Sequence, residues 1–419
     1  MRAQRSQGFA ALLSCATSSF VSSIRRVFQD WWERAQPSLR RRLPPRVFAA
    51  AEEVVPKVIR CRTEQNGFAV LKCSCGYTKR VAFTCKARFC PSCGAATAAK
   101  AAETIHGRLL NVRHRHVVLT IPDELWWLFY RNRRLLKLLS DAAAQALLTV
   151  FDQRCRRARV VPGIVCTVQT FGRKLNFHPH VHALVTEGGL RSDGVWQPVH
   201  FIPALSVCRR FQYCLLTALR NKYRHNQQVL ALVRRCFDRY PKGFRVNLVS
   251  SYRNARLAAA YCCRYTGRPP ISESRVSAYD GQNVTYWYDD YRTKQRLEVT
   301  VSAEQFLFLL LQHLPPKHAR TVRYYGLYAR AIRRRQFELV AQASQYDYTV
   351  PRERSRALSW RERLIALFAR DPHRCPQCGA LMELSAWYYP PPRGSPDATA
   401  HWKAATRPQP DDQLSLCFV

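Results

Sequence analysis

The sequence predicts an α+β fold in which a central antiparallel sheet is covered by helices, with a helical, cysteine-rich module before it and a helical region after it. Two apolar runs, 163–170 and 178–185, are joined by a short link that suits an antiparallel hairpin. Apolar residues recur at helical spacing on both sides of this hairpin, over 123–156 and 205–240. Cysteines gather at short spacings in two places, which is typical of metal-binding modules rather than of disulfide frameworks.

The N-terminal part is predicted to be a basic arm followed by helices. Residues 1–26 are rich in Ser, Ala and Arg and contain no acidic residue, so we interpret them as a disordered arm, with a transit peptide as the alternative. Large apolar residues follow at helical spacing over 27–57, and Pro44-Pro45 divides them into two short helices. With the cysteines that come next, these helices define a predicted zinc-binding domain, residues 27–105.

The following elements form one large predicted domain, residues 106–300. Its expected strands are 116–122, 163–170, 178–185 and 244–250, its expected helices are 123–156, 205–223, 227–240 and 254–266, and a polar-faced hairpin covers 283–291 and 296–302. Asn254 is the capping residue that opens the last of these helices.

The C-terminal part is predicted to be a helical region, 301–390, that begins with a helix over 303–314 and contains a second cysteine pair. Pro, Asp, Arg and Gln dominate the remainder, so residues 391–419 are expected to be a disordered tail.

The charge balance indicates a polyanionic partner. The chain has 67 Lys and Arg against 28 Asp and Glu, a net charge of +39, which leaves most cations without an internal partner. No run of about 18 apolar residues is present to span a bilayer, which favours nucleic acid over a membrane. Arg residues interleaved with many aromatic residues suit phosphate contacts and base stacking on single strands, although a basic solvated surface is the plainer interpretation.

Six cysteines in the N-terminal part predict a structural zinc site in a reducing cytoplasm. They are Cys61, Cys73, Cys75, Cys85, Cys90 and Cys93. A tetrahedral site accepts four thiolates, so either two are spare or more than one ion is bound. The preferred set is Cys73, Cys75, Cys90 and Cys93, with Cys61 and Cys85 in reserve; buried thiols without metal are the alternative.

A second cysteine pair, Cys375-Pro-Gln-Cys378-Gly, has the spacing of half a zinc site. Its missing ligands are expected from His373, from Cys417 or from a thiolate of the first cluster.

Three histidines in His178-Pro-His180-Val-His182 share one face of a predicted strand, because side chains alternate with a period of two. Such a face suits a divalent ion, and a site with an open position also accepts Mn²⁺ or Mg²⁺ together with a phosphate oxygen. The alternative is that these are surface or core histidines whose hydrogen bonds are satisfied without a metal, but three histidines in alternation favour a metal site.

Tyr261 and Tyr265 lie about one turn apart on the predicted 254–266 helix. Alone, such a pair is more often a packing feature. Together with the histidine strand and the cations Arg256, Arg264 and Arg268, however, the pair can be interpreted as nucleophiles. The cations and a nearby metal ion would favour a phenolate, which attacks a phosphodiester. A phosphotyrosine link conserves the energy of the phosphodiester bond, so rejoining the strands needs no ATP. The absence of a Gly-rich nucleotide-binding loop agrees with this.

Several motifs together resemble the rolling-circle insertion-sequence transposases that have an N-terminal cysteine-rich domain, including the insertion-sequence common-region group. The matching stretches are Phe83-Thr-Cys-Lys-Ala-Arg-Phe-Cys-Pro-Ser-Cys-Gly94, His116-Val-Val-Leu-Thr-Ile-Pro122, Gln169-Thr-Phe-Gly172, His178 to Val185, Tyr261-Cys-Cys-Arg-Tyr265, Pro269 to Arg275, His313-Leu-Pro-Pro-Lys317 and Arg323-Tyr-Tyr-Gly-Leu-Tyr328. The likeness covers most of the chain.

The resemblance implies an HUH-type nuclease with a ferredoxin-like sheet and a zinc-ribbon-like module. It implies that His180 and His182 are paired ligands of Mg²⁺ or Mn²⁺, with either His178 or Gln169 as the third, and that Tyr261 and Tyr265 are the nucleophiles. The expected partner is single-stranded DNA at the ends of the element, in the bacterial cytoplasm at the nucleoid. Expected DNA contacts are Arg256, Arg264, Arg268, Lys86 and Arg88.

Two other functions fit parts of the pattern. A rolling-circle replication initiator or relaxase would share the nuclease step and recognise other DNA ends. A non-catalytic zinc-ribbon DNA-binding protein would use the histidines and tyrosines only for packing. These features do not predict an oligomeric state.

Overall fold

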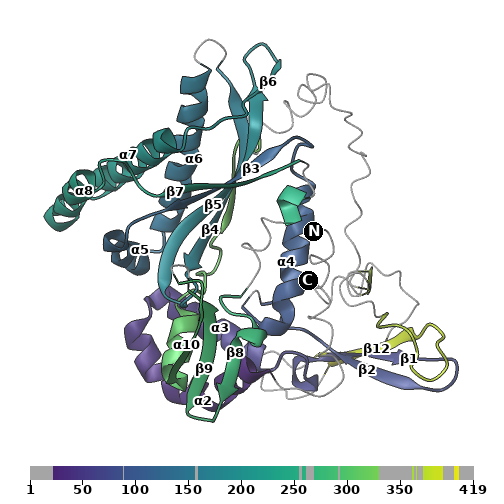
Figure 1. Cartoon of the computed structure of the whole chain (residues 1–419). Helices are drawn as coiled ribbons and strands as arrows, with labels where there is room; N and C mark the ends of the chain where they lie inside the picture. Colours follow the sequence, from purple (N-terminus) through teal and green to yellow (C-terminus); the bar gives the residue numbers. More distant parts are fainter. Residues whose placement is uncertain are drawn as a thin grey trace.

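The computed structural model describes residues 22–87, 89–155, 159–253, 257–260, 269–290, 293–329, 361–362, 365, 371–389 and 401–404. A central antiparallel sheet with the order β11-β4-β5-β3-β7 runs through the molecule (Figure 1). Its strands are β3 (His114–Thr120), β4 (Val161–Phe171), β5 (Phe177–Leu190), β7 (Val246–Tyr252) and β11 (Val322–Gly326), and β6 (Trp196–Pro198) pairs with β5.

The topology of this sheet confirms the predicted fold class. The chain runs through β3, helix α6, β4, β5, helices α7 and α8, and β7, while the spatial order is β4-β5-β3-β7. With every pairing antiparallel, this is the β-α-β-β-α-β arrangement of ferredoxin-like folds. Strands β5 and β3 are therefore central, and β5 is the strand that carries the histidines.

Helices cover one face of the sheet. They are η2 (Asp123–Leu125), α5 (Trp126–Arg131), α6 (Leu135–Arg154), α7 (Ala204–Lys222) and α8 (Gln227–Arg239). Because side chains alternate along β5, Val181, Ala183 and Val185 join α6 and α7 in one core. The intervening residues therefore point to the opposite face, where the C-terminal end of α4 (Pro91–His106) packs.

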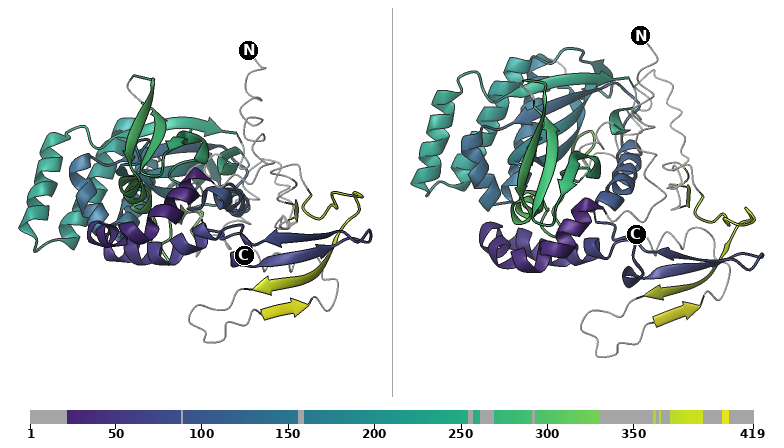
Figure 2. Two further views of the ribbon diagram at one scale, coloured as in Figure 1. Left: turned by 90° about the horizontal axis from the view of Figure 1, so that it is seen from below. Right: turned by 60° about the horizontal axis from the view of Figure 1, so that its bottom comes forward.

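A second body packs three helices on a three-stranded sheet. The elements are α2 (Ser23–Arg42), α3 (Pro45–Ile59), η3 (Glu273–Arg275), β8 (Val276–Tyr279), β9 (Asn283–Asp289), β10 (Arg296–Ser302) and α10 (Ala303–Leu311). Pro44 and Pro45 divide α2 from α3 as predicted. Phe28 and Trp32 share one core with Tyr286 and Phe306, so the N-terminal helices pack on elements from both sides of residue 300 (Figure 2).

A third, four-stranded sheet has the order β13-β12-β1-β2 and projects to one side (Figures 1 and 2). It contains β1 (Phe68–Lys72), β2 (Thr78–Ala82), β12 (Glu383–Tyr389) and β13 (His401–Ala404), with η1 (Glu64–Asn66) before it. β1 pairs with β12, so this sheet combines residues from both ends of the chain.

The C-terminal part differs from its prediction. The region 301–390, expected to be helical, contains α10 but also β11 and β12. Residues 401–404, within the expected disordered tail, form β13 because their backbone pairs with β12. The sequence pattern missed β11 and β12 because their partners β4 and β1 lie far away in the chain. No helix among the described residues has the length and apolar composition needed to cross a bilayer.

Candidate active site and metal centres

Two histidines and a glutamine converge on the face of the sheet opposite α6 and α7. The Nε2 atoms of His180 and His182 lie 3.1 Å apart. Gln169 of β4 lies opposite His180 in the register of the sheet. Its Oε1 atom lies 2.8 Å from His182 Nε2 and 3.1 Å from His180 Nε2. Three ligand atoms thus point to one place.

Hydrogen bonds orient both imidazoles. The Nδ1 atom of His180 donates to the carbonyl oxygen of His178 at 2.7 Å. The Nδ1 atom of His182 lies 2.9 Å from Nε2 of His116 on β3. With a proton on each Nδ1, the lone pairs of both Nε2 atoms face Gln169. This is the arrangement that a metal ion needs from histidine.

Burial keeps these imidazoles neutral. It lowers the pKa of His180 to about 4 and that of His116 to about 4. The pKa of His182 falls to about 2, mainly through burial and further through the charges of His180 and His116. At neutral pH the rings therefore act as Lewis bases rather than as cations.

The two candidates for a third ligand, His178 and Gln169, have different surroundings. His178 packs its ring against those of Trp126 and His180, with centroids 5.0 Å apart in both pairs. Among the described residues, only two groups, both of cysteines, bring three or more His, Cys, Asp or Glu ligand atoms within 4.8 Å of one another. His178, His180 and His182 therefore do not form such a group, whereas Gln169 Oε1 lies within 3.1 Å of both Nε2 atoms.

The two candidate tyrosines, together with Arg256, Arg264 and Arg268, lie outside the described residues, and so does Arg88. Residues 257–260, which lead directly to Tyr261, are described and helical. Ala258 and Ala259 are buried in the same cluster as Val165 and Leu184. This short helical stretch therefore packs on the face that carries the histidines.

His114 and His116 have roles in the structure that sequence reasoning missed. The pattern identified the strand but gave neither histidine a role. His114 donates from Nδ1 to Val112 O at 2.8 Å and accepts at Nε2 from the hydroxyl of Tyr328 at 2.6 Å. The available signal was their alternation, which places both on one face of β3.

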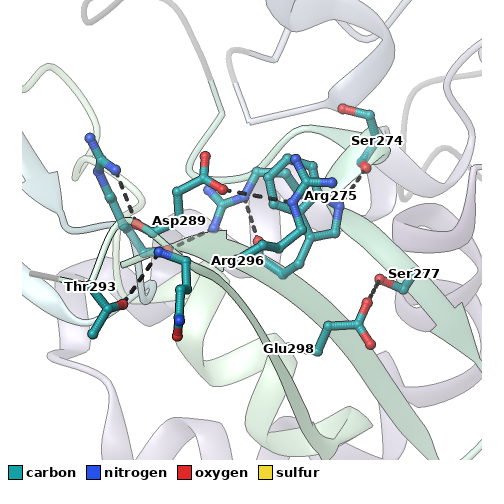
Figure 3. A network of polar contacts seen from close by, with 10 residues as sticks. Ser274, Arg275, Ser277, Asp289, Thr293, Arg296 and Glu298 are labelled. Atoms are coloured by element: carbon teal, nitrogen blue, oxygen red, sulfur yellow. Dashed lines mark hydrogen bonds and ion pairs between the residues drawn. The ribbon is translucent and has the colours of Figure 1, made fainter. Parts of the chain in front are cut away.

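The turn between β4 and β5 is anchored to the three-stranded sheet. Arg275 donates to the carbonyl oxygens of Trp287 at 2.8 Å and of Arg173, in the turn, at 2.7 Å. Arg173 in turn donates to the carbonyl oxygen of Asp289 at 3.0 Å. Figure 3 shows Arg275, at the end of η3, beside Asp289 of β9 and Arg296 of β10. The anchored turn holds the strand end that carries His178 and His180.

The first cysteine group is Cys61, Cys85, Cys90 and Cys93. Cys61 follows α3, Cys85 lies in a loop, and Cys90 and Cys93 lie at the N-terminal end of α4. The Cys93 sulfur lies 3.5 Å from that of Cys61 and 3.6 Å from that of Cys85. Hydrogen bonds from Cys61, Cys85 and Cys90 hold the pKa of Cys93 well below its usual range. This donor set fits a tetrahedral zinc ion.

The second cysteine group is Cys73, Cys75, Cys375 and Cys378. Its members come from the β1–β2 hairpin and from the loop before β12. The preferred zinc set, Cys73 and Cys75 with Cys90 and Cys93, is therefore wrong. The hairpin carries the first two thiols away from α4 to the C-terminal pair. Of the three sources expected for the missing ligands of Cys375 and Cys378, the structure supplies thiols of the N-terminal cysteines, namely Cys73 and Cys75.

Lys86, expected to contact DNA, lies in the loop that holds the first cysteine group. Its backbone N–H hydrogen-bonds to the sulfur of Cys93. Its φ of 54° is in the left-handed region, where the loop turns back toward α4.

A basic cavity of about 1030 Å³ reaches the candidate site. Its cationic lining residues are Arg46, Arg131, Arg133, Arg134, Lys137, Lys222, Lys317, Arg320 and Arg323, and the described lining includes no Asp or Glu. Gln169 lines it, and so do Pro269 and Pro270, which follow Tyr265 closely in the chain. Ala87 and Phe89, which lie between Cys85 and Cys90 of the first cysteine group, also line it.

Comparison with known proteins identifies the family. Residues 163–336 match a family described as "Putative transposase", and residues 27–121 match one described as "Transposase zinc-binding domain". The chain is 32% identical over 348 residues to the "Transposase for insertion sequence element IS801" of Pseudomonas savastanoi pv. phaseolicola, which covers 80% of this chain and 83% of that protein. The chain belongs to the IS91/IS801 transposase family.

A second relative of this transposase is the "Putative transposase y4qJ" of Sinorhizobium fredii (strain NBRC 101917 / NGR234), at 30% identity over 349 residues, 78% of this chain and 87% of that protein. No solved structure matches. The matched zinc-binding range contains the first cysteine group, and the matched transposase range contains Gln169, His180 and His182. Cys375 and Cys378 lie outside both ranges.

Proposed function

We propose that this transposase cleaves and rejoins single-stranded DNA by transesterification to tyrosine, in rolling-circle transposition of the HUH type. The observation that carries the proposal is the convergence of Gln169, His180 and His182 on the sheet face where residues 257–260 lead to Tyr261.

Two neutral imidazoles and an amide oxygen suit a divalent ion that keeps open positions for phosphate oxygens, such as Mg²⁺ or Mn²⁺. Bound there, the ion would supply electrostatic stabilisation of the charge on the scissile phosphate. His116 and the carbonyl oxygen of His178 hold the two rings so that their lone pairs stay aimed at this point. In this proposal Gln169 is the third ligand rather than His178.

Tyr261 and Tyr265 supply the nucleophiles. The phenol oxygen of one forms a bond to phosphorus as it loses its proton, the bond from phosphorus to the 3′ oxygen breaks, and that oxygen takes up a proton. The product is a 5′-phosphotyrosine and a free 3′ hydroxyl. Attack by a 3′ hydroxyl on this link reverses the step and joins strands without ATP. Two tyrosines allow cleavage and strand transfer to alternate, and Arg256, Arg264 and Arg268 favour the phenolate.

The cavity supplies the path for the DNA strand. Its cations attract phosphates, and its lining includes both Gln169 and the prolines that follow Tyr265 in the chain. We assign the zinc of the matched domain to Cys61, Cys85, Cys90 and Cys93, where it would be structural and would hold the loop that places Ala87 and Phe89 in the cavity lining. A DNA substrate implies the bacterial cytoplasm, at the nucleoid.

The test is incubation of the purified chain with labelled single-stranded DNA that contains the element ends and Mn²⁺. A protein–DNA adduct that survives denaturation is expected from the wild type and from Tyr213→Phe, a matched change at an exposed tyrosine on α7. The double variant Tyr261→Phe with Tyr265→Phe is expected to bind this DNA but form no adduct. An adduct in the double variant would reject the nucleophiles. DNA binding without any wild-type adduct would leave a non-catalytic DNA-binding protein, and activity only at replication origins would favour an initiator or relaxase.

A further inference from the structure

We propose that Cys73, Cys75, Cys375 and Cys378 bind a second zinc ion, which holds a C-terminal segment in the N-terminal zinc-binding module. The segment is residues 371–404, of which the structure describes 371–389 and 401–404. Its two ligands lie outside the matched zinc-binding range.

The sulfur spacing is that of a tetrahedral metal site. Cys73 Sγ lies 3.4 Å from Cys378 Sγ, and Cys75 Sγ lies 3.7 Å from Cys375 Sγ. Four thiolates at about 2.3 Å from a zinc ion are about 3.8 Å from one another by tetrahedral geometry. A disulfide would require a separation of about 2.05 Å. The spacing therefore fits shared coordination rather than two disulfides.

In each loop a glycine in the left-handed region follows the second cysteine, although the closing hydrogen bond spans three residues in the first loop and four in the second. Gly76 follows Cys75 with φ +88°, and Gly379 follows Cys378 with φ +73°. The N–H of Gly76 donates to Cys73 O at 3.0 Å, and the N–H of Gly379 donates to Cys375 O at 3.0 Å. A Cβ at either glycine would meet nothing within 4 Å, so the backbone conformation, not space, requires glycine. Each turn folds back so that its two thiols reach one point.

The end of the sheet near this site has only a small core. The buried cluster there is Leu71, Cys73, Cys375 and Met382, with Tyr77, Val81 and Leu384 partly buried around it. The other end of the sheet packs through aromatic rings, with Phe68 stacked on Tyr388. A metal site commonly supports so small a cluster. Two of its four residues are proposed ligands, so the metal would lie within this cluster.

Contacts beside the site already align the two segments. β1 and β12 pair antiparallel, with Leu71 opposite Leu384. Lys79 of β2 donates to the carbonyl oxygen of Pro372 at 3.1 Å. Arg361 pairs with Asp371 at 2.6 Å, and Asp371 accepts the N–H of His373 at 3.0 Å. The first cysteine group has four thiols of its own, so the two sites do not compete for ligands.

The test is the metal content of the full chain by mass spectrometry. The wild type is expected to hold about two zinc ions, one for each tetrathiolate group. Cys75→Ser, Cys378→Ser and their double variant should each lose about one ion, because all three disrupt the same site. Cys155→Ser, a matched change at a half-buried cysteine outside both groups, should keep both ions.

A second measurement keeps the proposal testable if a serine variant folds poorly. Cys378 is exposed, and Cys378→His offers another zinc ligand at the same place, so it should regain the ion that Cys378→Ser loses. Limited proteolysis should cut residues 371–404 early in Cys378→Ser and late in the wild type and Cys378→His. About one zinc ion in the wild type, two retained in Cys378→Ser, or iron in place of zinc would overturn the proposal. None of these readouts depends on DNA cleavage.

Discussion

His116 Nε2 lies 2.9 Å from Nδ1 of His182, across the pair of central strands β3 and β5. Because Nδ1 of His182 is thereby the donor, its Nε2 lone pair is free to face Gln169. His116 in this arrangement is a positioning residue: it acts on the metal through the ring of a ligand.

The first prediction is that His116→Ala weakens Mn²⁺ binding by about 10–100-fold, the usual effect of removing a hydrogen-bond partner of a ligating histidine. Isothermal titration calorimetry with Mn²⁺ alone measures it. His116→Gln keeps a polar acceptor near Nδ1 of His182 and should restore most of the affinity. Equal losses in both variants would show that the position matters only for packing.

The second prediction distinguishes the candidate third ligands. Gln169→Ala should lower both Mn²⁺ affinity and adduct formation, because it removes the oxygen that faces both Nε2 atoms. Gln169→His should retain cleavage, since imidazole suits the same ions. His178→Ala should lower Mn²⁺ affinity less than Gln169→Ala does, because it keeps the backbone carbonyl that accepts from His180 Nδ1 and removes only the ring that packs beside His180. The reverse ranking of Gln169→Ala and His178→Ala would make His178 the ligand.

Local periodicity explains which parts of the fold were predictable. Alternation along His178–Val185 predicts both a strand and which of its residues face the core, and Val181 and Ala183 are buried against α6 and α7 as expected. Pro44 and Pro45 mark the end of one helix and the start of another from local backbone restraint alone. These features depend on neighbours in the sequence.

The parts that were missed depend on pairing between distant segments. The spacing of Cys73 and Cys75 does not reveal that their partners are Cys375 and Cys378, because that follows from the register of β1 on β12. Likewise His116 reaches His182 only because β3 lies beside β5. β11 is a short strand that forms on the distant strand β4, and local pattern carries no information about such a partner.

The third prediction concerns the basic cavity. Arg134→Gln with Arg320→Gln should weaken binding of single-stranded DNA and make the slope of log affinity against log salt shallower by about 0.7 for each phosphate that the variant no longer neutralises. Fluorescence anisotropy over a range of salt concentrations measures both. Lys242→Gln removes an exposed cation that does not line the cavity and is the matched control. An equal weakening in Lys242→Gln would mean that general charge, not the cavity, determines binding.

The fourth prediction concerns acid stability and His313, which is buried between the two larger bodies of the fold. Its Nε2 donates to Leu175 O at 2.9 Å and its Nδ1 accepts from the Thr170 hydroxyl at 3.2 Å, so both ring nitrogens of the neutral imidazole are hydrogen-bonded. Burial lowers its pKa to about 3. The unfolded chain, with a histidine pKa of about 6.5, therefore binds a proton that the folded chain excludes.

The sign of the effect follows from this difference. The stabilising contribution is complete above pH of about 6.5 and is lost as the pH falls toward 3, at up to about 1.4 kcal/mol per pH unit for one proton. Denaturant unfolding at pH 7, 6 and 5 should therefore show a shallower fall in the free energy of unfolding for His313→Gln than for the wild type. Glutamine preserves a donor toward Leu175 but does not titrate. His200→Gln, at an exposed histidine, should keep the wild-type slope. Parallel pH profiles for wild type and His313→Gln would mean that His313 is accessible to protons in the folded chain, against its burial between Phe171 and Phe177.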